Sequence, residues 1–206
     1  MQTRTYRFGF LFISACIGLV DAASALEIRQ AVPDLAVQDA AGKPVKLSDF
    51  KGRVVVLEWT NPGCPYVRKH YDSGNMPGTQ KAALDQGVVW LTVSSTARGH
   101  GDFHAPADLQ AWLGEKGAAP SRLLMDTDGK LGRAFDARTT PHMYVVDKQG
   151  LLAYAGAIDS VPTPRIEDLA KATNYVKAAV PEVVAGKPVA TPVTKPYGCS
   201  VKYADG

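Results

Sequence analysis

The chain has 206 residues, and its 23 lysines and arginines against 20 aspartates and glutamates give a formal net charge of +3. So small a charge, without a run of Lys or Arg, argues against nucleic-acid binding, and we expect no nucleic-acid partner. The hydrophobic share of 46% is that of an ordinary globular protein whose length allows a sizeable core.

The first 25 residues have the pattern of a secretory signal peptide. Arg4 and Arg7 precede an apolar stretch at 8–20, and small residues at 23–25 supply a cleavage site. The apolar stretch is too short to cross a bilayer. We therefore expect residues 1–25 to be removed, leaving a periplasmic or secreted protein with no stable membrane insertion.

Two alternatives stay open for this segment. The letters "ISAC" resemble a lipoprotein processing box and would make Cys16 a lipidated first residue, but the residues after it remain apolar where a lipoprotein usually turns polar. The other alternative is that the apolar stretch is kept as an anchor or a core helix, which its charged start and small-residue end disfavour.

Cleavage would leave two cysteines, Cys64 and Cys199, in a chain exported to an oxidising compartment. Two such thiols are a candidate pair. The residues alone leave three roles open for them: a redox-active disulfide, an inert staple, or a bond between two chains.

Hydrophobic patterning predicts an α/β fold in the first half of the chain. Alternating residues at 33–50 predict an N-terminal β-hairpin. Continuous apolar runs at 52–60 and 87–95 predict strands covered on both faces of a parallel sheet. A helical segment from Cys64 onward, broken around "DSGNMPG", follows the first run, and a helix at 107–117 follows the second.

The second half is predicted to complete a three-layer α/β/α sandwich of the thioredoxin type with a mixed central sheet. Its expected elements are a strand at 121–127, a short helix at 129–135, a β-hairpin at 142–158 and an amphipathic helix at 166–186. The domain would span residues 26–186. Beyond it, the proline-bearing polar residues 187–206 are predicted to form a flexible arm that carries Cys199.

Cys64 lies where an apolar strand gives way to the first turn of a helix. Free backbone N–H groups and the helix dipole favour a thiolate there, and Pro65 suits the first helical position. Arg68 and Lys69, about one turn on, would add positive charge. An inert core thiol is the alternative. The turn "NPG" before Cys64 and the charged "RKH" after it, which predicts a solvated face, favour a reachable nucleophile instead.

The segment "PDLAVQDAAGKPVKLSDFKGRVVVLEW" resembles the start of the alkyl hydroperoxide reductase/thiol-specific antioxidant (redoxin) branch of the thioredoxin superfamily. The segments "CPYV", "TTPHMYVVDKQGLLAYAGAID" and "KPYGCSVKY" resemble a peroxiredoxin-like subgroup of it. The resemblance implies a thioredoxin fold, Cys64 as the attacking thiol and Pro141 as a cis-proline beside it. It further implies that Thr140 turns its backbone toward the sulfur to pair with an extended substrate, and that Cys199 is the resolving thiol.

The chain also departs from the patterns of these families. Val67 stands where thioredoxin-like reductases carry their second cysteine. Asn61 stands where true peroxiredoxins hold the peroxide with threonine or serine, and Pro141 stands where they have an arginine, with Arg138 only nearby. Asn61 and Arg68 can still donate hydrogen bonds, so both peroxide and disulfide substrates stay open.

These features predict an exported oxidoreductase with antioxidant activity, either a thiol–disulfide oxidoreductase or a peroxiredoxin-like thiol peroxidase. Its partners would be a protein disulfide or peroxide and a thiol electron donor, with no cofactor or metal. One alternative is a non-enzymatic protein that binds copper through Cys64, Cys199 and His142. Another is a redox-inert scaffold whose disulfide only fixes the arm.

Overall fold

The computed structural model of the chain describes residue 2 and residues 26–204. The predicted signal peptide, with its cleavage site and Cys16, lies outside the described residues except for residue 2. Within the described part of the chain, the helices are all too short or too polar to pass through a bilayer.

The centre of the fold is a five-stranded mixed sheet with the strand order β5-β4-β3-β7-β8. Strand β3 runs parallel to β4, and β4 runs parallel to β5, whereas β7 is antiparallel to both β3 and β8. All residues of β3 and β4 are buried, as expected of the two continuous apolar runs. The strands are β3 (Val55–Trp59), β4 (Val89–Ser94), β5 (Arg122–Met125), β7 (His142–Val146) and β8 (Leu152–Gly156).

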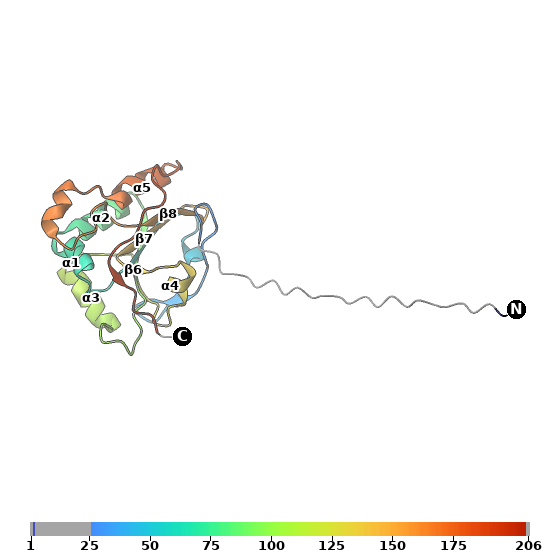
Figure 1. Cartoon of the computed structure of the whole chain (residues 1–206), viewed down its shortest axis with the longest axis horizontal. Helices are drawn as coiled ribbons and strands as arrows, with labels where there is room; N and C mark the ends of the chain where they lie inside the picture. The colour runs from blue at the N-terminus through green and yellow to red at the C-terminus, as the bar shows by residue number, and fades with distance from the viewer. Residues whose placement is uncertain (1, 3–25, 205–206) are drawn as a thin grey trace.

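Helices and a hairpin cover the two faces of this sheet, which gives the predicted three layers (Figure 1). One face carries α1 (Pro65–Asp72), α2 (Asn75–Leu84), α3 (Pro106–Glu115) and α5 (Tyr175–Val184). The other face carries α4 (Lys130–Ala134), the N-terminal hairpin of β1 (Val37–Gln38) and β2 (Pro44–Val45), and the 3₁₀ helix η1 (Leu47–Phe50).

Alternation along the strands divides the interior into two hydrophobic cores. Val56 of β3 packs with α1, α2, α3 and α5, whereas Leu57 and Trp59 pack with α4 and the hairpin. Cys64 and Met143 belong to the first core. A side chain on β7 therefore meets the thiol layer or the opposite layer according to its register.

Two helical predictions need correction. The long helix predicted at 166–186 is two helices, the 3₁₀ helix η2 (Ile166–Lys171) and α5. They are separate because the Asn174 side chain accepts a hydrogen bond from the backbone N–H of Lys177 at 2.9 Å and so caps a new helix. The break between α1 and α2 is also shorter than predicted, because Gly74 turns the chain at a φ of 73°.

The C-terminal arm spans residues 187–206, and its composition predicts a flexible segment. As far as residue 204 it lies against the domain, running from α5 past β8 and β6 to α4 (Figure 1). Val193 pairs with Ala155 of β8, and Cys199–Ser200 form β9, which pairs antiparallel with β6 (Thr139–Thr140).

Candidate active site

Cys64 is the N-cap residue of α1, and Pro65 is the first helical residue, as predicted. The backbone of Cys64 is extended, with φ −81° and ψ 121°. Its thiol donates a hydrogen bond to the carbonyl oxygen of Thr140 at 3.0 Å. The start of the helix and the residue before Pro141 therefore meet at this sulfur.

The peptide bond between Thr140 and Pro141 is cis, as the resemblance implies. Thr140 lies opposite Cys199 in the β6–β9 pair, and its hydroxyl donates to the Cys199 carbonyl at 3.5 Å. The arm thus brings the second cysteine to the first, and both thiols are free. Burial, a hydrogen bond with Cys64 and the charge of Cys64 raise the pKa of Cys199 to about 11.

The accessibility of Cys64 differs from the reachable thiol that the sequence predicts. Only 2% of the residue is exposed, and Cys199 of the arm packs against the core cluster that contains it. The sequence around Cys64 predicts only the turn before it and the helix after it. It contains no signal for the position of the arm. The cover includes a segment 135 residues further along the chain.

Lys69 and His70 are not part of a solvated face either, although Arg68 is exposed. Lys69 is 1% exposed and its ammonium lies 3.0 Å from the carboxylate of Asp159, in the loop that follows β8. Tyr197 of the arm donates to the same carboxylate and lies 3.2 Å from His70 Nε2. The positive charge of Lys69 is therefore neutralised in a buried ion pair with Asp159, and the same carboxylate binds the arm through Tyr197.

Asn61 shapes the loop before Cys64 and has no spare donor. Its Nδ2 donates to the Thr96 hydroxyl at 3.1 Å and to the Asp102 carbonyl at 3.4 Å. Its Oδ1 accepts from the N–H of Gly63 at 2.7 Å. Arg68, the other predicted donor, uses Nε to bind the Pro62 carbonyl at 3.0 Å. Both side chains thus support the turn that presents Cys64.

His142 faces the layer opposite to Cys64, which removes one ligand of the copper alternative. Its Nδ1 lies 3.2 Å from the Tyr144 hydroxyl, and its ring lies 4.6 Å from the Tyr144 ring. Tyr144 belongs to the core around Trp59, whereas Cys64 belongs to the other core. Among the described residues, no three His, Cys, Asp or Glu side chains gather as a metal site would require.

Glu58 is a buried acid on the helical side of the sheet that the sequence analysis does not single out. Its carboxylate accepts from Tyr71 at 2.6 Å, Trp90 at 2.9 Å, Gln80 at 3.1 Å and Thr92 at 3.2 Å. Burial raises the pKa of Glu58. An acidic residue inside the apolar run "VVVLEW" is the signal that could have found it.

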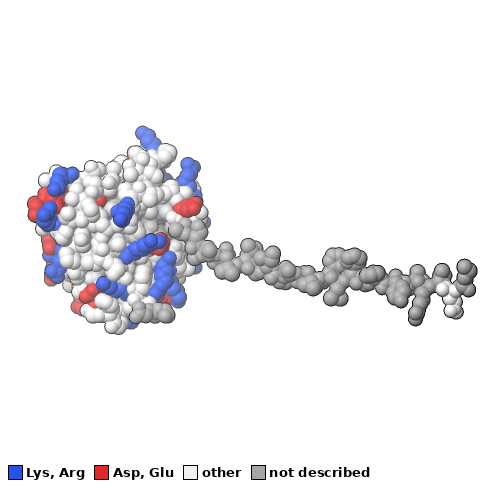
Figure 2. Space-filling view, viewed as in Figure 1, with Lys and Arg blue, Asp and Glu red and all other residues white. Residues whose placement is uncertain are grey.

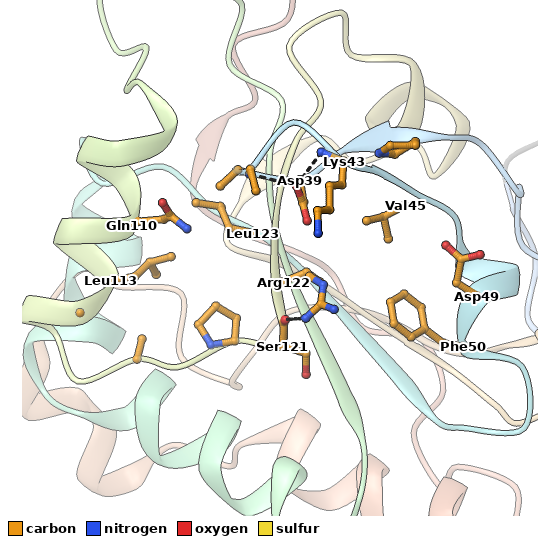
Figure 3. A pocket seen from close by; sticks show the side chains of 16 residues that line it. Asp39, Lys43, Val45, Asp49, Phe50, Gln110, Leu113, Ser121, Arg122 and Leu123 are labelled. Atoms are coloured by element: carbon orange, nitrogen blue, oxygen red, sulfur yellow. Dashed lines mark hydrogen bonds between the residues drawn. The ribbon is translucent and has the colours of Figure 1, made fainter.

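A cavity of about 730 Å³ lies away from the two thiols, between α3, the edge of β5 and the N-terminal hairpin (Figure 3). Gln110, Leu123 and Val45 contribute to its wall, with Lys43 and Arg122 among the labelled side chains. On the face drawn in Figure 2, basic and acidic side chains are interspersed and form no continuous basic patch.

The cysteine at a helix start, the cis-proline beside it and the mixed sheet between helices define a thioredoxin-fold thiol protein. Comparison with known protein families identifies the family. The chain belongs to the AhpC/TSA family, whose model matches residues 28–155.

Two curated relatives are similar over about half of the chain. The peroxiredoxin Bcp of Bacillus subtilis (strain 168) is 32% identical over 115 residues, which are 54% of this chain and 64% of that protein, just under two thirds. The thiol-disulfide oxidoreductase ResA of Bacillus thuringiensis (strain Al Hakam) is 28% identical over 117 residues, or 52% of this chain and 68% of ResA. Both names denote oxidoreductases.

Solved structures show the same fold. A hypothetical protein from Sinorhizobium meliloti 1021 superposes with a TM-score of 0.73 at 21% identity, covering 89% of this chain and 98% of its own. The thioredoxin domain of a thiol-disulfide oxidoreductase from Bacteroides vulgatus gives 0.51 at 21% identity, covering 71% of this chain and 97% of its own.

Proposed function

We propose that the protein is an exported oxidoreductase that reduces disulfides with Cys64 as the attacking thiol and Cys199 as the resolving thiol. The observation that carries the proposal is the β6–β9 pair, which lays Cys199 beside the residue that accepts the Cys64 hydrogen bond. The AhpC/TSA match and the two named relatives support thiol redox chemistry. The signal-like pattern of residues 1–25 supports export.

The first step is attack by the Cys64 thiolate on one sulfur of a substrate disulfide. A Cys64–substrate disulfide forms, the substrate's own S–S bond breaks, and the other substrate sulfur leaves as a thiolate that takes up a proton. Cys64 has to lose its proton beforehand, and in the thiol form this hydrogen is donated in a hydrogen bond to the Thr140 carbonyl oxygen. The partial positive charge at the start of α1 supports the resulting anion.

The second step is attack by Cys199 on the Cys64 sulfur. It releases the substrate's second thiolate and forms the Cys64–Cys199 disulfide, so the substrate gains the two electrons that the protein dithiol loses. With the arm docked, the pKa of Cys199 is raised to about 11, which keeps this thiol protonated before the first step. Once Cys64 is in a mixed disulfide its charge is gone, and two of the causes that raise the pKa of Cys199 disappear. An external thiol donor then restores the dithiol.

Peroxide reduction is a second candidate, favoured by the similarity to a peroxiredoxin. The thiolate would attack one peroxide oxygen, leaving Cys64 as a sulfenic acid and releasing water or an alcohol; Cys199 would then displace hydroxide as water. The geometry supports this candidate less, because the two N–H groups of the Asn61 amide are already bonded within the loop.

The test is rapid mixing of reduced protein with a small disulfide or with hydrogen peroxide, followed by site-resolved mass analysis. We expect the wild type to form the Cys64–Cys199 disulfide, faster with the disulfide than with the peroxide. Cys199→Ser should stop at the mixed disulfide on Cys64, and Cys64→Ser should not react. A Cys199→Ser variant that turns over as fast as the wild type would contradict the resolving role.

A further inference from the structure

We propose that the C-terminal arm is a strap that occupies the strand position beside Thr140 that a substrate needs, so that Cys64 becomes reachable only when residues 193–203 leave the domain. The inference rests on the proposed function for the identity of the attacking thiol. It goes beyond that function by making release of the arm a step that precedes reaction.

The strap fits the backbone at β6 closely. Gly198 has a φ of 134°, and a Cβ atom at this position would lie 2.0 Å from the Thr140 carbonyl oxygen. On the other side of Cys199, the N–H of Val201 donates to the Arg138 carbonyl at 3.0 Å. Only glycine allows the arm this near to β6, so the contact is specific to the residues on both sides.

Glycines of the domain receive the arm at its two ends. A Cβ on Gly156 of β8 would lie 2.2 Å from the Thr194 hydroxyl, and one on Gly132 of α4 would lie 2.3 Å from the Tyr203 hydroxyl. Thr194 accepts from the N–H of Ala157 at 2.9 Å. Tyr203 donates to the carbonyl of Ala137 at 2.7 Å. On either side of β9, the domain therefore has a glycine that leaves room for the arm and a backbone group that hydrogen-bonds to it.

A buried polar cluster, called here the latch, holds the middle of the arm. Tyr197 donates its hydroxyl hydrogen to Asp159, whose carboxylate is also bound by Lys69 at 3.0 Å. His70 Nδ1 lies 2.8 Å from the Asn75 amide nitrogen, which assigns the ring hydrogen to Nε2, facing Tyr197. Without Tyr197 the carboxylate would lose one of its buried donors, which a folded protein tolerates poorly.

The docked arm closes the site and also completes it. With β9 in place, the edge of β6 is paired and Cys64 is 2% exposed, so an extended substrate cannot bind there. The same placement puts Cys199 next to Cys64 for the resolving step. Release of the arm should therefore speed attack on a substrate and slow resolution, two opposite effects that a purely structural contact would not produce.

The test is the rate at which iodoacetamide alkylates Cys64 in the reduced full-length protein, measured by site-resolved mass analysis at fixed pH. Gly198→Ala should release β9, since its Cβ collides with Thr140. Tyr197→Phe should loosen the latch. We expect each to raise the alkylation rate of Cys64 at least about tenfold, because the reachable fraction of the protein rises.

Two matched variants serve as controls. Gly114→Ala on α3 and Gly78→Ala on α2 each add a Cβ in open space. Both should alkylate at the wild-type rate. Equal rates in all five proteins, or a wild-type Cys64 that already reacts like a free cysteine, would overturn the strap.

Amide hydrogen exchange of the wild type gives a measurement that needs no variant. The N–H groups of Val201 and Ala97 are bonded across the arm contact, to Arg138 and Lys202 respectively. They should exchange together and faster than the amides of β3. If they exchange only with global unfolding, the arm does not leave and the proposal is wrong.

These outcomes separate the strap from the proposed function, since alkylation needs no redox partner. If the variants expose Cys64 but no protein reacts with a disulfide, the strap stands and the proposed function fails. If the wild type reduces disulfides while Cys64 alkylation ignores the arm, the function stands and the strap fails.

Discussion

Cys199 holds its proton more tightly than an ordinary cysteine because its environment disfavours the thiolate. It is partly buried beside Cys64, and burial is the largest cause of the rise in its pKa, followed by the hydrogen bond with Cys64 and the charge of Cys64. Lys202 opposes them with a smaller effect than any of the three. In the proposed mechanism, this environment suits Cys199 to the second step.

The raised pKa of Cys199 can be measured directly. Alkylation of Cys199 followed across pH should give an apparent pKa of about 11 in the reduced wild type. Cys64→Ala should lower that value, because it removes the neighbouring charge and hydrogen bond but leaves most of the burial. The reading is by mass analysis of the Cys199 peptide. An unchanged titration in the variant would mean that burial alone sets the proton affinity of Cys199.

At the scale of elements, the sequence predicts best where the signal is local. The apolar runs at β3 and β4 and the proline after Cys64 are short patterns with one structural meaning, and they match the structure. The prediction of one long final helix is wrong because it follows the helical spacing of apolar residues and does not take Asn174 as the cap of a new helix.

The position of the arm could not be read from the sequence. The β6–β9 pair joins residues about sixty positions apart. From the sequence alone, Gly198 is typical of a turn; only the structure shows that its missing side chain makes room for Thr140. The pairing of Lys69 with Asp159 crosses 90 positions in the same way. Local charge patterns predicted a solvated face there, since nothing nearby in sequence identifies the distant partner.

The cap of α5 can be tested on its own. Asn174→Ala should lower the free energy of unfolding by about 1 kcal/mol, because Lys177 loses its acceptor at the helix start. Asn174→Asp keeps an acceptor and should recover part of this. It loses the amide donation to the Thr79 hydroxyl at 2.9 Å, so a residual deficit would report that contact. Urea denaturation of the three proteins gives the comparison, and equal midpoints would contradict the cap.

At the scale of the whole molecule, the folded protein buries titratable groups of both kinds, acids and bases. Burial lowers the pKa values of His70 and His142 to about 4, so both are neutral in the folded protein at neutral pH. Burial raises the pKa values of Glu58 and Asp126, which has the opposite effect on stability in acid. The net pH dependence of the wild type mixes these contributions, and a variant is needed to isolate one of them.

His142→Gln removes one such group from the layer opposite the thiols. In the wild type, the unfolded chain takes up a proton on this residue below its ordinary pKa of 6.5, whereas the folded chain resists until about 4. The stability that His142 contributes is therefore complete above pH 6.5 and is lost as the pH falls toward 4. Between about pH 7.5 and about pH 5, the wild type should lose on the order of 2 kcal/mol more unfolding free energy than the variant. Urea unfolding at the two pH values measures the difference, in which Glu58, Asp126 and His70 cancel because both proteins contain them. Equal losses in the two proteins would show that His142 takes up its proton over the same pH range in the folded and the unfolded protein.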